Sequence, residues 1–235
     1  MQKDIFGAAV LDYFNTNKPN SITVLSEDFE DDEIPVPYLF RTYAEMSEIE
    51  QKALQLSFGK TLDVGCGAGS HSLFLQNDKK LEVTALDISE GAIEVCIKRG
   101  VHHTICGNFY DQEIKYDTIL LLMNGSGIAG TLENLNTFFE KLKSLLNKNG
   151  QVLIDSSDLI YLFENENGEY WVDASKGYYG EMTYQMQYKN ETSEPFDWLY
   201  LDYNTLQRAA SLNRFNCELI LEGKHYDYLA KLSLN

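Results

Sequence analysis

Residues 60–158 alternate between short apolar segments and segments whose apolar residues recur at helical spacing. The apolar segments are KTLDVG at 60–65, LEVTALD at 81–87, HTICG at 103–107, YDTILLLM at 116–123 and QVLID at 151–155. The fourth is apolar along most of its length, as expected for a strand covered on both faces. Strands and helices in strict alternation need right-handed crossovers, so the pattern predicts a doubly wound, mainly parallel α/β sheet.

The rest of the chain completes this fold. A helical pattern at 204–215 and two strand-like segments at 217–223 and 226–234 predict a closing helix and an antiparallel hairpin, which bring the sheet to seven strands. Residues 160–203 contain both tryptophans and many tyrosines, and two of their segments alternate like paired strands. We predict one structural unit at 60–235, with 160–203 inserted as an aromatic β-hairpin lid.

Residues 1–59 are expected to form an N-terminal helical cap. Apolar residues suit one short helix near the start of the chain and another between residues 38 and 56. Between them lies the acidic run Glu27–Pro37, which contains two prolines near its end. This run predicts a solvated loop in preference to a docking site for a basic partner.

The charge of the chain narrows the possible partners. Its 235 residues include 36 acidic and 19 basic side chains, for a net charge of −17. Phosphate backbones and anionic membranes repel such a surface, so we expect neither nucleic acid nor a membrane as partner. No apolar run approaches the roughly 20 residues of a membrane span, and Asp4 stands where a signal peptide has its basic region. Four widely spaced cysteines predict a reduced, cytoplasmic protein without a metal site.

Glycines recur at every second position after the first predicted strand, at Gly65, Gly67 and Gly69. A strand that ends in glycines and leads into a helix offers backbone N–H groups and the positive helix end to a ligand. The second strand ends in Asp87, where a carboxylate can meet a ribose diol. These features predict an adenosine-containing cofactor at the carboxyl edge of the sheet.

The spacing argues against a dinucleotide. A dinucleotide fingerprint needs a third glycine or an alanine where this chain has Ser70 or Ser72, depending on which glycine starts the count. Asp63 precedes the first glycine by two positions. A carboxylate there would repel a pyrophosphate and suits a cofactor with a cationic amino-acid end.

The segment Asp63-Val-Gly65-Cys66-Gly67-Ala-Gly69 resembles the glycine-rich motif of class I S-adenosylmethionine-dependent methyltransferases. The resemblance covers about 60–158 and 204–235, and it implies S-adenosylmethionine (SAM) as cofactor and S-adenosylhomocysteine (SAH) as product. It places Asp87 on the ribose hydroxyls and the segment Gly107–Phe109 beside the adenine, with Asn108 where the family often has Asp. The cofactor-binding positions that it implies are Asp63, Gly65, Cys66, Gly67, Gly69, His71, Asp87, Ile88, Asn108, Phe109, Met123 and Asn124.

The resemblance also narrows the class of methyl acceptor. The fourth strand leads into Met-Asn-Gly-Ser-Gly at 123–127, whereas family members that methylate bases or glutamine side chains carry Asn/Asp-Pro-Pro-Tyr/Phe there. The segment DSSD at 155–158 leaves the fifth strand at the edge where open α/β sheets place substrates, but no octahedral metal set accompanies it. We therefore expect a small-molecule acceptor.

Individual side chains near these segments are candidates for catalysis and acceptor binding. His71 opens the helix after the glycines and is the candidate general base, with mere proximity to the cofactor as the alternative. Arg41 suits the cofactor carboxylate, an anionic acceptor or an ordinary ion pair. The tyrosines of the lid either line the acceptor site or pack within the lid or against a second subunit. The candidate acceptor residues are Arg41, Tyr43, Asn124, Ser156, Tyr178 and Tyr179.

The sequence thus predicts a SAM-dependent methyltransferase, monomeric or homodimeric, that transfers a methyl group to a small molecule by direct displacement. Because the methyl group on the sulfonium is already activated, the main tasks of the enzyme are to align the nucleophile and to desolvate it. Two alternatives stay open. One is a nicotinamide-dependent oxidoreductase of the Rossmann type, which Ser70 and Ser72 disfavour. The other is a non-catalytic SAM-binding module that acts through a protein partner at the acidic loop Glu27–Glu33.

Overall fold

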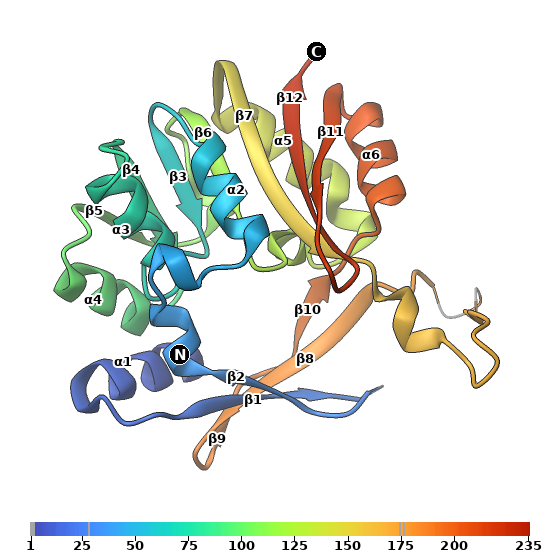
Figure 1. Ribbon diagram of the computed structural model, residues 1–235, viewed down its shortest axis with the longest axis horizontal. Coiled ribbons are helices and arrows are strands. Elements are labelled where there is room, and N and C mark those ends of the chain that lie inside the picture. Colours follow the sequence, from blue (N-terminus) through green and yellow to red (C-terminus); the bar gives the residue numbers. More distant parts are fainter. Residues whose placement is uncertain (1–2, 28, 174, 176) are drawn as a thin grey trace.

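The computed structural model describes residues 3–27, 29–173, 175 and 177–235. Within these residues, seven strands form a sheet in the order β11-β12-β7-β6-β3-β4-β5 (Figure 1). The five strands from β7 to β5 run parallel, whereas β12 is antiparallel to both β7 and β11. The predicted doubly wound fold with a terminal hairpin is therefore confirmed. The strands are β3 Thr61–Val64, β4 Val83–Asp87, β5 His103–Cys106, β6 Tyr116–Leu121, β7 Leu146–Ser157, β11 Phe215–Glu222 and β12 Asp227–Leu234.

Helices cover both faces of this sheet because successive strand side chains point to opposite sides. Leu120 of β6 packs in a buried cluster with Leu54 of α2, whereas its neighbour Ile119 packs with Phe138 of α5. Helix α4 is capped at both ends: Ser89 accepts a hydrogen bond from a backbone N–H of the first turn, and the left-handed Gly100 ends the helix. The helices are α2 Glu48–Leu56, α3 Ser70–Asn77, α4 Glu90–Arg99, α5 Leu135–Leu145 and α6 Tyr203–Leu212. No helix in the described part of the chain is long and apolar enough to cross a membrane.

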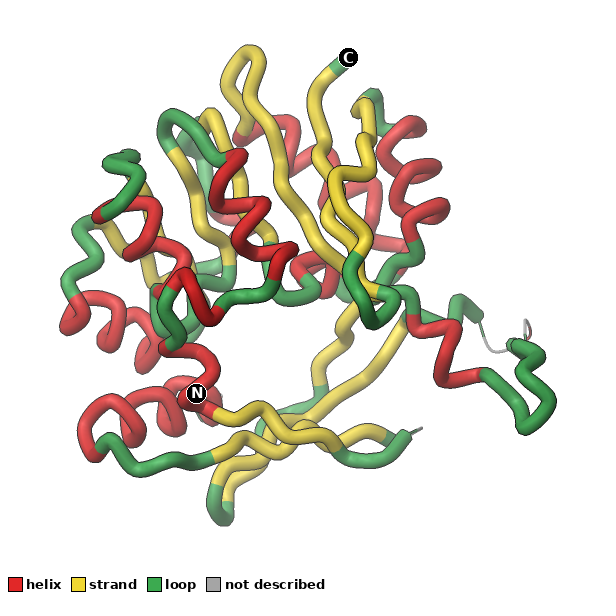
Figure 2. The backbone as a smooth tube through the Cα atoms, viewed as in Figure 1, coloured by secondary structure: helices red, strands yellow, loops and turns green. Residues whose placement is uncertain are grey.

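A second antiparallel sheet lies opposite the carboxyl edge of the first (Figures 1 and 2). It has the strand order β10-β8-β1-β2 among the described residues, with the short β9 paired to β8. The antiparallel pairing of β8 with β10 confirms that the two alternating segments within 160–203 are paired strands. The strands are β1 Ser21–Ser26, β2 Asp32–Pro35, β8 Glu181–Tyr188, β9 Glu191–Thr192 and β10 Phe196–Leu199.

The N-terminal segment differs from the helical cap expected from the sequence. It contains the strands β1 and β2, and β1 pairs with β8, so that Thr23 lies opposite Gln187. The acidic run Glu27–Pro37, expected as a loop, supplies β2 and begins the short 3-10 helix η1 (Val36–Phe40). The expectation was wrong because strand formation here depends on a partner strand far along the chain, which local periodicity does not reveal.

Helix α1 (Ile5–Thr16) packs against α4, beside the glycine-rich loop. Asp4, which caps α1, also accepts hydrogen bonds from Ser89 Oγ and Gly91 N, both at 2.9 Å. The two helices cross closely: a Cβ atom on Gly91 would lie 2.7 Å from the backbone of Gly7. This crossing places Phe6 over the loop, 3.6 Å from the position that a Cβ of Gly67 would take.

Candidate functional site

The glycine-rich loop follows β3, and its three glycines all adopt the left-handed region, with φ of 69° at Gly65, 52° at Gly67 and 81° at Gly69. Side chains are strained at such angles, which explains the glycines. A Cβ on Gly65 would meet nothing within 4 Å, whereas one on Gly69 would lie 2.8 Å from Cys96 Sγ. The loop is thus packed on one side and leaves open space beside Gly65, where a ligand can approach the backbone.

Asp87 stands at the end of β4, next to this loop. Its Oδ2 accepts a hydrogen bond from Gly67 N and its Oδ1 one from Ser89 N, both at 2.9 Å. Burial raises the pKa of the Asp87 carboxyl, and these hydrogen bonds partly offset the rise. The following side chain, Ile88, is 75% exposed, so it offers bare apolar surface beside the carboxylate.

The segment after β5 is joined to Asp87 through its backbone, because Gly107 N donates to the Asp87 carbonyl at 2.9 Å. Asn108 caps a 3-10 turn with its side chain, which accepts from Tyr110 N. Phe109 is buried, and its ring lies 5.9 Å from that of Phe138 in the main core. The predicted adenine-flanking segment therefore lies beside the carboxylate, although its aromatic ring belongs to the core.

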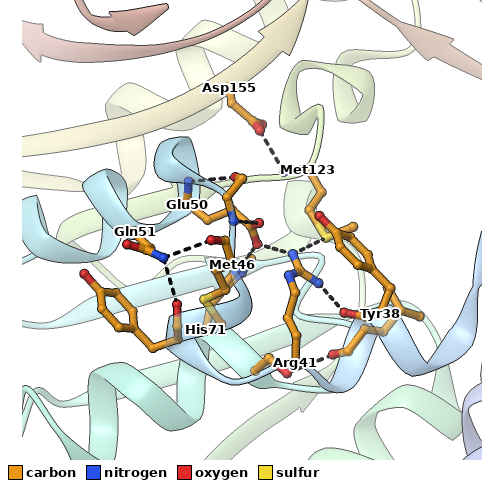
Figure 3. Close-up of polar contacts among 12 residues, drawn as sticks. Tyr38, Arg41, Met46, Glu50, Gln51, His71, Met123 and Asp155 are labelled. Atoms are coloured by element: carbon orange, nitrogen blue, oxygen red, sulfur yellow. Dashed lines mark hydrogen bonds and ion pairs between the residues drawn. The ribbon is translucent and has the colours of Figure 1, made fainter. Parts of the chain in front are cut away.

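His71 is on the first turn of α3, where it faces the Glu50 carboxylate (Figure 3). The carboxylate of Asp63 lies on the other side of its ring. Its Nε2 is 2.7 Å from Glu50 Oε1 of α2, and its Nδ1 is 4.0 Å from Asp63 Oδ1. Asp63 is buried and accepts a hydrogen bond from Ser72 Oγ at 2.6 Å. The candidate base is thus engaged in a buried polar network.

Arg41 extends this network towards β6 (Figure 3). Its guanidinium pairs with Glu50, lies 3.3 Å from Met123 Sδ and stacks over the ring of Tyr38. Burial raises the pKa of the Glu50 carboxyl, but the hydrogen bond and charge of His71 and the charge of Arg41 outweigh it and lower that pKa to about 2. Arg41 is 7% exposed, yet its Nε has no hydrogen-bond partner among the described residues. A buried donor without a partner costs free energy, so an acceptor atom placed beside Nε would stabilise the site.

Met123 and Asn124 form an unusual turn after β6, because both are non-glycine residues in the left-handed region. Asp155 of β7 holds this turn: its carboxylate accepts from Met123 N at 3.1 Å (Figure 3) and from Gly125 N at 3.2 Å. Burial raises the pKa of Asp155 to about 7 despite these hydrogen bonds. Ser157 Oγ, also on β7, donates to Asn124 Oδ1 at 2.9 Å.

The remaining candidate acceptor residues have structural contacts. The ring of Tyr43 stacks on Phe74 of α3 with centroids 4.1 Å apart. Ser156 is buried and accepts a hydrogen bond from Leu201 N, which ties β7 to the segment after β10. Tyr178 donates to Asp202, the cap of α6.

Tyr179 donates to Asp158 Oδ1 at 2.7 Å. Of the six candidate acceptor residues, Asn124 belongs to the Met123 turn and Arg41 contacts Met123 Sδ. Sequence reasoning missed the roles of Glu50 and Asp155. Glu50 carries one signal, the pattern Ser47-x-x-Glu50 of a capping box, but that pattern predicts only a helix start.

Comparison with known proteins identifies the family. A family model described as a methyltransferase domain matches residues 61–150. The solved structure of a SAM-dependent methyltransferase from Bacteroides fragilis, in complex with S-adenosyl-L-homocysteine, is 48% identical to this chain, with a TM-score of 0.92. The match covers 99% of this chain and 95% of that one. The chain belongs to the SAM-dependent methyltransferases.

More distant solved structures share the methyltransferase fold. A DhpI–SAM–HEP complex matches with a TM-score of 0.62 at 15% identity, over 97% of this chain and 94% of that one. A SAM-dependent methyltransferase from Clostridium acetobutylicum matches with a TM-score of 0.57 at 14% identity, over 83% and 92%. The search of curated proteins gave no match. None of these findings favours the oxidoreductase or the non-catalytic module.

Proposed function

We propose that this methyltransferase acts on a small molecule held between the carboxyl edge of the first sheet and the second sheet. One observation carries the proposal: the chain itself covers that edge from two sides. On one side α1 is fixed to α4 through Asp4. On the other, the ring of Trp198 lies so close to Gly127 that a Cβ there would be 1.9 Å from it. An edge covered in this way favours a small acceptor over a macromolecular one.

The residues at this edge fit SAM. The open space beside Gly65 suits a ligand lying against the backbone, and Asp87 suits the ribose diol. The exposed Ile88 suits the adenine. We assign the amino-acid end of the cofactor to the side of Asp63 and Arg41, where the free Arg41 Nε would meet its carboxylate.

The reaction depends on alignment of the acceptor with the methyl group more than on acid–base catalysis by the chain. When bound, SAM supplies a methyl group on a sulfonium, which a nucleophile can displace directly. Asp155 fixes the Met123–Asn124 turn, which we place beside the cofactor, and this fixed backbone can align the acceptor. We assign His71 a positioning role, because its ring is buried and bonded to Glu50. Burial and the hydrogen bond to Asp158 raise the pKa of Tyr179, which opposes its use as a phenolate base.

The cofactor assignment is tested by calorimetric titration of SAH into wild type and two matched variants. Asp87→Ala is expected to weaken binding by about tenfold or more, because hydrogen bonds to a charged group contribute about 1.5–3 kcal/mol. Asp117→Ala is the control, since Asp117 also accepts a backbone hydrogen bond, from Lys60 N at 2.8 Å, but at the amino end of the strands. Equal SAH affinity in Asp87→Ala and Asp117→Ala would contradict the placement of the cofactor.

The acceptor class is tested with labelled SAM. Wild type is incubated with a cell extract separated by ultrafiltration into small molecules and macromolecules. We expect transfer of the labelled methyl group to the small-molecule fraction, and its loss in Asp87→Ala. Labelling of the macromolecular fraction alone would overturn the proposal. SAH binding without any transfer would support the non-catalytic module instead.

A further inference from the structure

One face of the second sheet points towards the first sheet. On β8, Met186 and Tyr188 pack beside the α1 cluster, so the alternating residues Met182 and Tyr184 share their face. The partner of Met182 on β10 is Trp198, whose ring packs on Gly127 after β6. Contacts with both α1 and Gly127 fix the direction of this face, which we call the inner face.

The strand register extends the inner face across β1 and β2. Val24 lies opposite Met186 on one side and opposite Asp32 on the other, so all three share that face. The inner face therefore consists of apolar and aromatic side chains, Ser26 and one acid. Its members on β1, β2, β8 and β10 are Ile22, Val24, Ser26, Asp32, Ile34, Met182, Tyr184, Met186, Tyr188, Phe196 and Trp198.

Asp32 supplies the only charge on the inner face of these four described strands. Two tyrosines lie on the same face: Tyr184 of β8, and Tyr200 just after β10, with rings 6.4 Å apart and nearly perpendicular. Asp32 is two strands from β8 in the register, and its negative charge acts on both tyrosines. Burial raises the pKa of Tyr184, and Asp32 adds to the rise. The nearest described cation at the Met123 turn is Arg41, and its charge is offset by the buried Glu50.

This combination favours a positive ligand. Aromatic faces attract ammonium groups through the ring quadrupole, and the attraction strengthens where water is excluded. A single carboxylate on the same face as the rings adds a Coulomb attraction for the same positive charge. An acceptor that carries a carboxylate or phosphate would be repelled by Asp32, and no basic side chain on the inner face of these described strands would offset the repulsion.

We propose that the acceptor carries an ammonium group, which lies on the rings of Tyr184 and Tyr200 and faces Asp32. This inference rests on the proposed function, because it assigns the acceptor to the inner face. It makes the second sheet a recognition surface for amines, in which the rings provide shape and Asp32 selects charge.

The test compares two probes that share a shape and differ in charge: choline and 3,3-dimethylbutan-1-ol. Each is titrated by calorimetry into wild type already saturated with SAH. Choline is expected to bind at least about tenfold more tightly, in line with a partly desolvated cation–aromatic contact plus the acid. Equal binding of the two probes, or no binding of choline, would overturn the inference.

Variants locate the effect. Asp32 is exposed, so Asp32→Asn leaves the packing intact and is expected to remove most of the preference for choline. Tyr184→Leu is expected to weaken the binding of choline more than the binding of 3,3-dimethylbutan-1-ol. Asp197→Asn is the control: Asp197 is also an exposed acid of this sheet, but it lies between Phe196 and Trp198 and so points to the outer face. A preference that survives Asp32→Asn, or falls equally in Asp197→Asn, would contradict the assignment.

Because SAH binding is measured first in every sample, the two proposals fail separately. Loss of SAH binding in wild type counts against the proposed function. Normal SAH binding without discrimination between choline and its neutral analogue counts against the ammonium acceptor alone.

Discussion

Asp155 holds the backbone N–H of Met123 at 3.1 Å across the ends of two neighbouring strands, β7 and β6. The contact joins a buried carboxylate to a turn in which two successive side-chain-bearing residues are left-handed. Such backbone strain persists only where the surroundings impose it, and it gathers at functional sites. The turn is therefore held by a buried carboxyl group whose ionisation the fold disfavours.

The first prediction concerns the ionisation of Asp155. Burial raises its pKa from 3.8 to about 7, so between these values the folded protein holds a proton that the unfolded chain has released. The free energy of unfolding of wild type therefore falls as pH rises through this range. Asp155→Asn lacks this dependence. The melting temperature of the variant relative to wild type is therefore expected to rise progressively from pH 5 to pH 8.

The same variant separates stability from function. We expect the affinity of wild type for SAH to fall between pH 8 and pH 6, as Asp155 gains a proton and loses acceptor capacity. In Asp155→Asn the affinity is expected to be lower at pH 8 and nearly independent of pH. Asp117→Asn, at the opposite edge of the sheet, serves as the control and should follow wild type in its pH profile. A wild-type profile shared by all three proteins would rule out this role of Asp155.

The second prediction concerns Glu50, which neutralises Arg41 inside the protein. Glu50→Gln leaves a buried positive charge unpaired, a change that typically costs about 3–5 kcal/mol. For a chain of this size, the melting temperature at pH 7 should fall by on the order of 10 °C. The pKa of Glu50 is lowered from 4.5 to about 2, so the stabilisation is present above pH 4.5 and is lost as pH falls towards 2.

A double variant provides the control for this pair. Replacing both charges, as in Arg41→Met with Glu50→Leu, removes the ion pair without stranding either partner, and much of the stability should return. We expect this double variant to bind SAH weakly, because it lacks the free Arg41 Nε. Full SAH affinity in the double variant would contradict the assignment of Arg41 to the cofactor.

Local signals in the sequence were sufficient for the first sheet and for the cofactor loop. The loop requires left-handed φ angles at Gly65, Gly67 and Gly69, and such angles favour glycine. The loop could therefore be recognised in the sequence from its glycine motif. Asp87 could be predicted as a site residue because it is the last residue of a predicted strand. Glu50, in contrast, looks like an ordinary helix-start acid, and only the packing of α2 against α3 brings it to His71.

The second sheet was only half predicted, for a related reason. β8 and β10 are neighbours in sequence and alternate clearly, so their pairing could be inferred. β1 and β2 lie at the other end of the chain, and Asp32–Pro35 reads as part of an acidic run. Their register with β8 is a long-range property, so the charge that Asp32 brings to the inner face could not be inferred from sequence.

The third prediction concerns the contact between the two sheets. A Cβ on Gly127 would lie 1.9 Å from the ring of Trp198, so Gly127→Ala must displace that ring. We expect a lower melting temperature and a red-shifted tryptophan emission, measured in a Trp171→Phe background because Trp171 is 72% exposed. Adding Trp198→Leu should restore part of the stability. An unchanged emission spectrum in Gly127→Ala would show that the ring does not rest on this glycine.

The last prediction concerns Asp4, which fixes α1 to the first turn of α4. Its carboxylate accepts from Gly7 N, Ser89 Oγ and Gly91 N, at 2.8, 2.9 and 2.9 Å. Because α1 carries Phe6 over the glycine loop, a looser α1 should let the cofactor leave sooner. Hydrogen bonds to a charged acceptor contribute about 1.5–3 kcal/mol each. Even partial loss in Asp4→Ala is therefore expected to speed SAH dissociation by about tenfold.

Stopped-flow displacement of SAH, followed by tryptophan fluorescence, measures this rate. Glu94→Ala is the matched control, because Glu94 is a surface acid of α4 that pairs only with Lys98, one turn away, among the contacts found in the described chain. Removing it changes the net charge by the same amount as Asp4→Ala and leaves the crossing of Gly7 and Gly91 intact. If α1 retains the cofactor, Asp4→Ala dissociates faster and Glu94→Ala matches wild type. Equal rates in all three proteins would mean that α1 only supports the fold.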